Sequence, residues 1–345
     1  MGAWLLVVAA VVLDRLVGDP RWCLHPVEAM GWAIRQLQHL AESWAGDRPG
    51  RLRLAGGLLT LLVVGGSGGA GWLLERLALS HRLALPLLVI ALASALAGRS
   101  LEQAVQAVLA ALPEQREAGG AGSLDPARQR LAWIVGRDVA RLERPGLLRA
   151  AAETASENGV DGLFAPLFWM LLGALLWDLA AAAGLVGPLS LAWGFKAAST
   201  LDSMLGYRRG RLLWLGTAGA RLDDLLTWLP CRLVALSLPL LAGSALQTLP
   251  RFRRALREGA PDPSPNAGVS QAAYALASGL RLGGLNHYGG VARGKPRLHE
   301  EGRCPDGPGV ERILQLSRRL TLLWLLAALV LDLSGAALRA GLGAQ

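Results

Sequence analysis

Residues 54–74 read LAGGLLTLLVVGGSGGAGWLL and contain no charged residue. A helix needs about 20 mostly apolar residues to cross the hydrocarbon core of a bilayer, so this stretch is long enough to span one. Its glycine run at 65–69 has no lysine nearby, which favours close helix packing over a phosphate-binding loop. The stretch predicts a membrane helix.

The rest of the chain shows the same character. Hydrophobic residues make up 52% of it and charged residues only 18%, whereas about 25% of a soluble domain is charged. Further apolar runs cover Ala3–Val17, which is the weakest, Leu83–Gly98, Gly162–Trp177, Leu179–Phe195, Leu225–Pro250 and Leu320–Leu338. We therefore predict an all-α polytopic integral membrane protein with about 5–6 apolar helices. Residues 1–345 form a single membrane-embedded domain in this prediction.

Polar segments separate these runs, and each carries more Lys and Arg than Asp and Glu. They cover residues 18–53, 99–160, 196–224 and 251–319. The positive-inside rule assigns all of them to the cytoplasm. One span at 225–250 would place its two flanking segments on opposite faces, so we expect a re-entrant segment or a broken hairpin there, kinked at Pro230 and Pro239.

The basic segment at 99–160 resembles soluble helix. Asp125 and Pro126 predict a helix start, and arginines recur over a basic helix at 128–149. The net charge of +9 does not indicate nucleic-acid binding, because no such motif accompanies it. Cys23, Cys231 and Cys304 are isolated and indicate neither a disulfide framework nor a zinc site.

Four polar blocks could carry chemistry. In the first, Glu153, Glu157 and Asp161 stand at i, i+4 and i+8. On a helix they would share one face and repel one another, so a cation, either Mg²⁺ or Arg, should offset them. The alternative is a solvated helix end paired with Arg137 or Arg141.

The second block is KAASTLDSMLGYRRGRLLWLGTAGARLDD at 196–224. Lys196, Ser199 and Ser203 lie on one helical face, and Gly206 is expected to end the helix. Phosphoryl chemistry needs cations for phosphate and carboxylates for metal, and this block supplies both. The alternative is a cytoplasmic loop whose charges pair with one another.

The third block joins SPNAG at 264–268 to RLGGLNHYGG at 281–290. Paired glycines beside Arg and Asn suit a backbone that approaches an anion closely, although the chain has no GxxxxGK[ST] phosphate loop. The fourth block runs from Asp14 to Arg21 and continues at His25. Its alternative is an interfacial turn with an internal ion pair.

In this order the blocks resemble the CbiB/CobD family of adenosylcobinamide-phosphate synthases. The matching pieces, which cover residues 13 to 290, are LDRLVGDPRWCLHPVEAMG (13–31), IVGRD (134–138), ENGVDGLFAPLFW (157–169), KAASTLDSMLGYRRG (196–210), ARLDDLLTWLPCRL (220–233), SPNAG (264–268) and RLGGLNHYGG (281–290).

The resemblance implies a multi-pass protein of the bacterial inner membrane. The shared polarity and basic flanks of the four blocks predict that they converge on one cavity that faces the cytoplasm. It implies ATP-dependent amide formation between (R)-1-aminopropan-2-ol O-phosphate and adenosylcobyric acid, giving adenosylcobinamide phosphate. Mg²⁺ and ATP are the expected cofactors. The expected partners are the corrinoid and amine substrates, the lipid bilayer and other cobalamin-assembly membrane proteins, with no nucleic acid.

The resemblance and the blocks together select candidate residues. The catalytic candidates are Glu157, Asp161, Asp202, Asp223 and Asp224. The metal ligands among them are Asp161, Asp202 and Asp224. Clamps for phosphate or propionate are expected from Lys196, Arg208, Arg221 and Arg281. The residues expected to orient or contact substrate are Asp19, His25, Asn158, Asn266, Asn286 and Tyr288.

A protein without enzymatic activity is the competing class, either an inner-membrane sensor of the AmpE type or a transporter. A transporter would be expected to show internal repeats and polar residues at the bilayer midplane. The chain shows no repeat, and its polar blocks lie mostly between the apolar runs.

Overall fold

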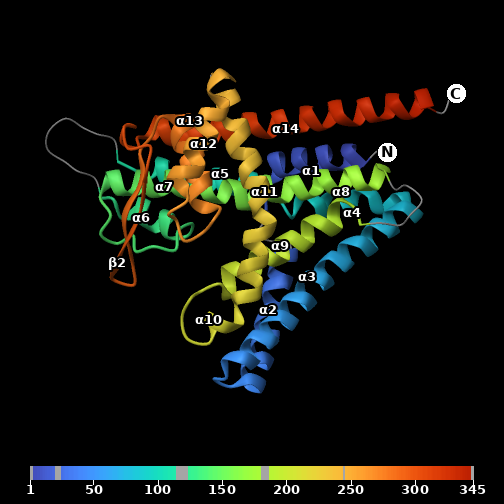
Figure 1. Ribbon diagram of the computed structural model, residues 1–345, viewed down its shortest axis with the longest axis horizontal. Helices are drawn as coiled ribbons and strands as arrows, with labels where there is room; N and C mark the ends of the chain where they lie inside the picture. Colours follow the sequence, from blue (N-terminus) through green and yellow to red (C-terminus); the bar gives the residue numbers. More distant parts are fainter. Residues whose placement is uncertain (1–2, 20–24, 114–122, 180–185, 244, 343–345) are drawn as a thin grey trace. The chain divides into compact units, whose positions relative to one another are not determined.

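The computed structural model describes residues 3–19, 25–113, 123–179, 186–243 and 245–342 (Figure 1). Fourteen α-helices are described: α1 (Ala3–Val17), α2 (Pro26–Ala45), α3 (Pro49–Ser80), α4 (Leu85–Ala93), α5 (Gly98–Ala110), α6 (Asp125–Ala132), α7 (Arg144–Gly159), α8 (Ala165–Leu179), α9 (Pro188–Leu205), α10 (Leu212–Leu215), α11 (Thr217–Leu241), α12 (Thr248–Gly259), α13 (Ala267–Ser278) and α14 (Gly307–Leu342). The shorter elements are the 3₁₀ turns η1 (Arg82–Ala84) and η3 (Ala245–Gln247), the π-helical turn η2 (Val160–Phe164), and the strands β1 (Leu282–Tyr288) and β2 (Val291–Leu298).

The chain divides into two compact units. Unit 1 comprises Met1–Arg99, Asp161–Thr227 and Trp324–Gln345. Unit 2 comprises Ser100–Val160 and Trp228–Leu323. The single domain expected from the sequence stays a prediction.

Within the described residues, five helical stretches are long and apolar enough to cross a membrane: Pro49–Ser80, Arg82–Ala110, Arg144–Trp177, Thr217–Leu241 and Gly307–Leu333. They expose large apolar side chains, such as Leu61 on α3 and Leu331 on α14, which is the surface that a lipid-facing helix presents. The predicted all-α polytopic membrane fold is confirmed. The run expected at Leu179–Phe195 is not among the five stretches, and residues 180–185 lie outside the described part of the chain.

Of the two forms expected for residues 225–250, the broken hairpin was wrong, whereas the re-entrant segment stays a prediction. α11 continues through Pro230 and Pro239 as far as Leu241. A proline frees the carbonyl four residues earlier, and neighbouring groups can satisfy it within a membrane helix. For Pro230 this carbonyl belongs to Leu226, which accepts a hydrogen bond from the indole N–H of Trp169 at 3.2 Å.

The basic helix expected at 128–149 was also wrong. α6 ends at Ala132 and α7 begins at Arg144. The intervening turns are fixed from outside, because the hydroxyl of Thr154 donates to the carbonyl of Ile134 at 2.8 Å. The N-cap residue of α6 is Leu124, and Asp125 is its first helical residue. The helix therefore begins one residue earlier than the sequence predicted.

Unit 1 is built around the contact between α3 and α9. One of its buried clusters comprises Met30, Ile34, Leu59, Val63, Ala197, Leu201 and Leu205. Close approach requires glycine, because a Cβ at Gly71 would lie 2.9 Å from Ser190 Cα. The predicted packing role of the glycine-rich run is confirmed at Gly68, where a Cβ would lie 3.3 Å from the carbonyl oxygen of Ser190. Gly65, by contrast, lines an apolar groove of about 560 Å³.

Unit 2 packs α12 beside α13 and adds the antiparallel hairpin β1–β2 (Figure 1). β1 and β2 are the only strands in the described ranges. The hairpin turns at Gly289 and Gly290, whose φ values of 57° and 79° are those that a two-residue hairpin turn requires. This hairpin carries the predicted RLGGLNHYGG motif.

Candidate active site

Lys196 lies among carboxylates in unit 1. It is half-buried on α9, and the charges of Asp14, Asp19, Asp161 and Asp223 act on it. These four residues come from three segments that are far apart in the sequence. The fold therefore gathers parts of three predicted blocks around one cation.

Asp14 is the most buried of these four carboxylates, with 4% of its surface exposed. Its Oδ2 accepts the backbone N–H of Arg99 at 3.4 Å, whereas its Oδ1 has no hydrogen-bond partner among the described residues. A buried carboxylate oxygen without a partner can accept a hydrogen bond from a ligand, for example from an amine. Asp14 was not among the predicted site residues, although its motif was.

His25 and Asp19 hold the start of α2. The Nδ1 atom of His25 accepts the N–H of Val27 at 3.3 Å, and its Nε2 atom lies 3.3 Å from Asp19 Oδ1. This is the internal ion pair that the alternative interpretation of the fourth block expected, and their substrate-binding role stays a prediction. Residues 20–24 of this block, with Cys23, lie outside the described part of the chain.

Asp161 lies on the π-helical turn Val160–Phe164. Such turns are rare and are frequent at functional sites. The carbonyl of Gly162 accepts the N–H of Ala97 at 2.8 Å, which anchors the turn outside its own helix. Because the helical repeat changes at this turn, Asp161 does not continue the regular i, i+4 spacing of Glu153 and Glu157.

Asp202, Asp223 and Asp224 form a group of like charges. Asp223 lies within the fields of both other carboxylates. Gly206 ends α9, as predicted, and it makes room for Asp202, whose Oδ1 atom lies 2.0 Å from where a Cβ of Gly206 would be. Repulsion within such a group is relieved by a bound cation or by protonation.

The carboxylate oxygens of these three aspartates are the kind of ligand that Mg²⁺ prefers. The described residues include no set of three or more His, Cys, Asp or Glu side chains arranged to enclose a metal ion. Mg²⁺ usually binds through one or two carboxylates together with water and substrate phosphates. Asp202 and Asp224, which lie within each other's field, could supply the protein's share of such a shell.

Two predicted clamps belong to the same unit. The guanidinium of Arg221 lies 4.0 Å from the Asp224 carboxylate, and the charge of Arg208 also acts on Asp224. A third arginine of the second block, Arg211, forms an ion pair outside the block, with its Nε atom 2.7 Å from Asp47 Oδ1. The charges of the second block thus pair partly with one another, as its alternative expected, while Lys196 and Arg208 remain candidates for anion binding.

Unit 2 holds a separate buried network around Glu153, whose side chain is 0% exposed. Arg137 forms an ion pair with it, and the N–H of Gly283 donates to it at 2.8 Å. Arg137 and Arg149 both donate to the Oδ1 atom of Asn286, at 2.9 and 3.0 Å. Glu153 is therefore offset by arginine, one of the two cations that the first block predicted.

The IVGRD motif is bound to the hairpin. Asp138 accepts the N–H groups of Gly290 at 2.7 Å and Gly289 at 3.1 Å. These two donors hold the pKa of Asp138 below its ordinary value. The N–H of Asp138 in turn donates to the carbonyl of His287 at 2.8 Å. The glycine pair thus binds a carboxylate of the same chain in place of an external anion.

Glu157 has cationic and amide neighbours. The amide of Gln271 donates to it at 2.6 Å. Lys295 lies 3.5 Å from Asp262. Burial lowers the pKa of this lysine, but the surrounding negative charges, with Glu157 and Asp262 the largest of them, together raise it above its ordinary value. Sequence reasoning missed Lys295, because only the strand register that pairs it with Gly284 brings it to this place.

The remaining predicted residues of unit 2 have partners within the chain. Asn266 accepts a hydrogen bond from Arg232 at 2.5 Å, and Asn158 donates to Thr154 at 2.8 Å. The guanidinium of Arg281 donates to Cys304 Sγ at 3.0 Å. Tyr288 stacks against Arg293.

The predicted site residues thus fall into two groups. Unit 1 holds Asp19, His25, Asp161, Lys196, Asp202, Arg208, Arg221, Asp223 and Asp224. Unit 2 holds Glu157, Asn158, Asn266, Arg281, Asn286 and Tyr288. Their convergence on one cavity stays a prediction.

Comparison with known proteins places the chain in a family. A family model described as "CobD/Cbib protein" matches residues 7–317. Cobalamin biosynthesis protein CobD of Synechocystis sp. is 44% identical over 298 residues, which are 86% of this chain and 82% of that protein. Cobalamin biosynthesis protein CbiB of Salmonella typhi is 38% identical over 349 residues, covering 99% of this chain and 98% of that protein. No solved structure matches significantly. The chain therefore belongs to the CobD/CbiB family, whose matched members are named cobalamin biosynthesis proteins.

Proposed function

We propose that this protein acts in cobalamin biosynthesis as an adenosylcobinamide-phosphate synthase. It would join the amine of (R)-1-aminopropan-2-ol O-phosphate to a propionate carboxyl of adenosylcobyric acid, with ATP as the energy source. Family membership supports the pathway. The observation that supports the proposed chemistry is the cluster around Lys196, in which the charges of carboxylates from three separate motifs act on one cation.

The reaction forms a C–N bond and breaks a carboxyl C–O bond. A carboxylate is a poor electrophile, so its oxygen must first become a leaving group, most simply by taking a phosphoryl group from ATP. The nitrogen lone pair then attacks the carbonyl carbon, phosphate leaves with the bonding electrons of the C–O bond, and the nitrogen loses a proton. The protein must bind phosphate, orient the amine and accept that proton.

Carboxylates near Lys196 suit the amine end of this reaction. Asp161 and Asp14 would bind the ammonium group of the amine before reaction, and one of them would accept its proton. The half-buried position of Lys196 strengthens its attraction for an anionic oxygen compared with a lysine in water. Lys196 would therefore hold the propionate or the phosphate that replaces its oxygen.

Asp202 and Asp224 would be the protein's ligands for Mg²⁺, with Asp161 as a third candidate. The ion, when bound, would supply neutralisation of phosphate charge. Arg208 would add a second positive contact for phosphate from the segment that follows α9. Arg281 is a weaker candidate than the sequence indicated, because its guanidinium already donates to Cys304.

We further propose that the chain is a multi-pass protein of the bacterial inner membrane with this site facing the cytoplasm. The five apolar helical stretches support membrane insertion. ATP is available in the cytoplasm, which requires the site to open there. Association with other membrane proteins of cobalamin assembly belongs to the same proposal.

Complementation tests the proposed function. A bacterium that lacks its own cobinamide-phosphate-forming activity should grow under cobalamin-requiring conditions when it expresses this chain, without added cobinamide. Expression of the Asp161→Asn variant should restore growth only when cobinamide is supplied. If the unmodified chain also required added cobinamide, the synthase proposal would be wrong and a sensor or transporter would be favoured.

A further inference from the structure

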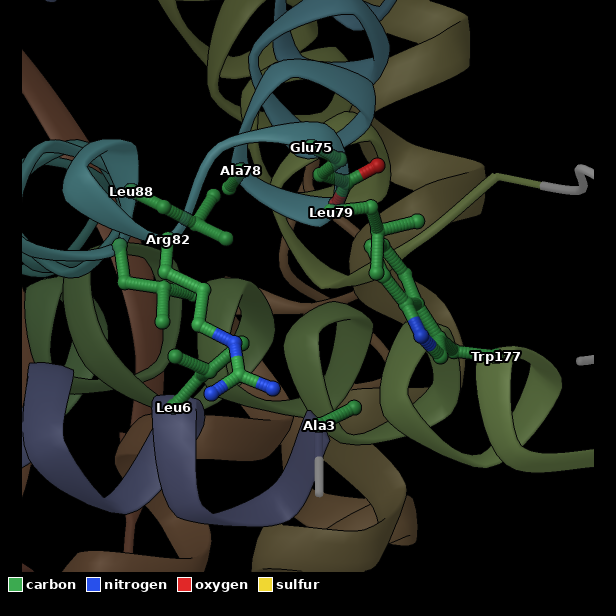
Figure 2. Close-up of a pocket in the computed structure, with 9 residues that line it drawn as sticks. Ala3, Leu6, Glu75, Ala78, Leu79, Arg82, Leu88 and Trp177 are labelled. Atoms are coloured by element: carbon green, nitrogen blue, oxygen red, sulfur yellow. The ribbon is translucent and has the colours of Figure 1, made fainter. Parts of the chain in front are cut away.

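Unit 1 contains a cavity of about 140 Å³ that the proposed reaction does not use. Its lining is aliphatic and aromatic apart from Glu75 and Arg82, and comprises Ala3, Leu6, Glu75, Ala78, Leu79, Arg82, Leu85, Leu88 and Trp177. Figure 2 shows the Arg82 side chain reaching into this cavity towards Leu6, with Trp177 on the opposite wall.

The cavity lies at a turn between two membrane-spanning stretches. The candidate spans Pro49–Ser80 and Arg82–Ala110 meet at His81. A short turn between two spans must lie at a membrane surface, because a lipid-facing turn within the hydrocarbon would leave backbone groups unsatisfied. Leu83 in this turn is 96% exposed, and nearby Arg76 lies 5.5 Å from the ring centroid of Trp72. Trp and Arg at this position are typical of the lipid headgroup level.

Arg82 is available for an external anion. None of the described residues forms an ion pair or hydrogen bond with its guanidinium. Glu75 lines the same cavity but is used within the protein. Its carboxylate accepts the N–H groups at the start of α9, from Leu189 at 2.6 Å, Gly187 at 3.1 Å and Ser190 at 3.2 Å. The start of a helix carries partial positive charge, so these contacts compensate the charge of Glu75.

We propose that this cavity binds an anionic phospholipid, with the lipid phosphate on Arg82 and the adjoining glycerol and upper acyl chain against Leu6, Leu79 and Leu88. Charge complementarity selects the occupant. A guanidinium binds phosphate through paired hydrogen bonds, and the aliphatic walls favour hydrocarbon over water. A free phosphate ion would gain nothing from these walls, whereas a phospholipid at the membrane surface presents both groups together.

Native mass spectrometry of the full-length protein, released from detergent and titrated with defined lipids, tests this assignment. The probes are phosphatidylglycerol, phosphatidylcholine and inorganic phosphate. Wild-type protein should retain phosphatidylglycerol in preference to phosphatidylcholine. Arg82→Gln should weaken phosphatidylglycerol binding by about tenfold, the effect expected for loss of one charge-assisted hydrogen-bonded contact. Arg82→Lys should retain most of the binding.

Arg130→Gln is the matched control. It removes the same charge from an exposed position on α6, in unit 2, and should leave lipid binding unchanged. Equal retention of phosphatidylglycerol by wild type and Arg82→Gln would overturn the assignment, as would equal binding of the two lipids by wild type. Displacement of phosphatidylglycerol by millimolar inorganic phosphate would reduce the site to a phosphate site and also overturn it.

Discussion

Lys196 is one cation acting against the charges of four carboxylates. Further basic groups lie nearby, because His25 contacts Asp19 and the charge of Arg15 acts on Asp14. Carboxylates gathered in this way can also bind a cationic ligand, either an ammonium group or a metal ion. The proposed substrates bring both, because the amine is protonated in water and the phosphates carry Mg²⁺.

Asp161→Asn and Asp202→Asn should each reduce the rate of amide formation by at least about a hundredfold, the low end of what a positioned acid–base group contributes. Both replacements are near-isosteric, so the variants should fold. Turnover in detergent micelles or liposomes measures the effect. Asp125→Asn, on the exposed helix α6, should retain full activity. Activity like that of the wild type in both site variants would remove these residues from the site.

Arg137 and Glu153 form a buried ion pair, with side chains 8% and 0% exposed. Removing one partner of a buried pair costs about 3–5 kcal/mol, because the other charge is left uncompensated. Arg137→Gln should lower the free energy of unfolding by up to this amount, as measured by chemical denaturation in detergent micelles. Arg149, whose Nε lies 3.9 Å from Glu153, and the N–H of Gly283 would still act on the carboxylate. Arg137→Gln combined with Glu153→Gln should be less damaging than Arg137→Gln alone.

Arg141→Gln provides the control for this pair, because Arg141 is exposed in the same segment. Its stability should stay within about 0.5 kcal/mol of the wild type. A double variant that was as unstable as the sum of both single variants would show that the two charges do not interact.

For single residues, the sequence predicts which kind of charge a side chain needs beside it better than it predicts which residue supplies that charge. The motif spacing correctly indicated that Glu153 needs a cation, and it offered Arg137 as one candidate. It could not indicate Lys295, whose position depends on pairing with Gly284 across a hairpin. It also could not show that Asp161 leaves the regular helical spacing of Glu157. Asp161 lies on a π-helical turn, and packing rather than local propensity forms such a turn.

Among the elements, α3 and α9 depend on glycine for their contact. Gly71→Ala should destabilise the protein by about 1–3 kcal/mol, the cost of overpacking, because the new Cβ would lie 2.9 Å from the backbone of Ser190. Gly65→Ala is the matched control on the same helix. Nothing lies within 4 Å of a Cβ at Gly65, and alanine favours helix over glycine. Thermal unfolding in detergent would compare them, and equal losses would contradict the proposed packing.

The β1–β2 turn depends on the charge of Asp138. Because the N–H groups of Gly290 and Gly289 lower the pKa of this carboxyl, the ionised form stabilises the turn. That contribution is fully present above the ordinary aspartate pKa of about 4 and is lost as pH falls through the lower folded value. Amide hydrogen exchange at Gly289 and Gly290 should therefore be slow near neutral pH.

Asp138→Ala should accelerate exchange of these two amides at neutral pH, whereas Arg141→Ala in the same segment should not. Protection of Gly289 and Gly290 that was unchanged in Asp138→Ala would show that the turn holds without its carboxylate. Mass spectrometry of the peptide that contains the turn would measure the exchange.

The sequence predicted a helix correctly where a long apolar run forms it. It failed where a single contact between distant segments determines whether the helix continues. The uncharged run at 54–74 lies within α3 as expected. The broken hairpin that was one expectation for residues 225–250 does not form. α11 continues through Pro230, and the Leu226 carbonyl that loses its usual donor to this proline accepts the indole N–H of Trp169. The basic segment after Ala132 leaves the helix, and its Asp138 reaches the hairpin turn.

For the whole molecule, family membership and five membrane-spanning stretches leave the substrates as the central question. If Lys196 and Arg208 bind phosphate, the phosphate of the amine should matter more than its carbon skeleton. Losing one methyl group from an apolar contact costs only about 1–3 kcal/mol. Losing a phosphate leaves cations unpaired in the site and costs more.

The most direct measurement is amide formation by the purified protein from adenosylcobyric acid, ATP and Mg²⁺ with three amines. These are aminopropanol phosphate, ethanolamine phosphate and unphosphorylated aminopropanol, and the product is identified by mass spectrometry. The proposed function predicts efficient reaction with the first, partial reaction with the second and very little with the third. Equal use of aminopropanol with and without phosphate would contradict the phosphate-binding role of Lys196 and Arg208, and no product from any amine would contradict the synthase function itself.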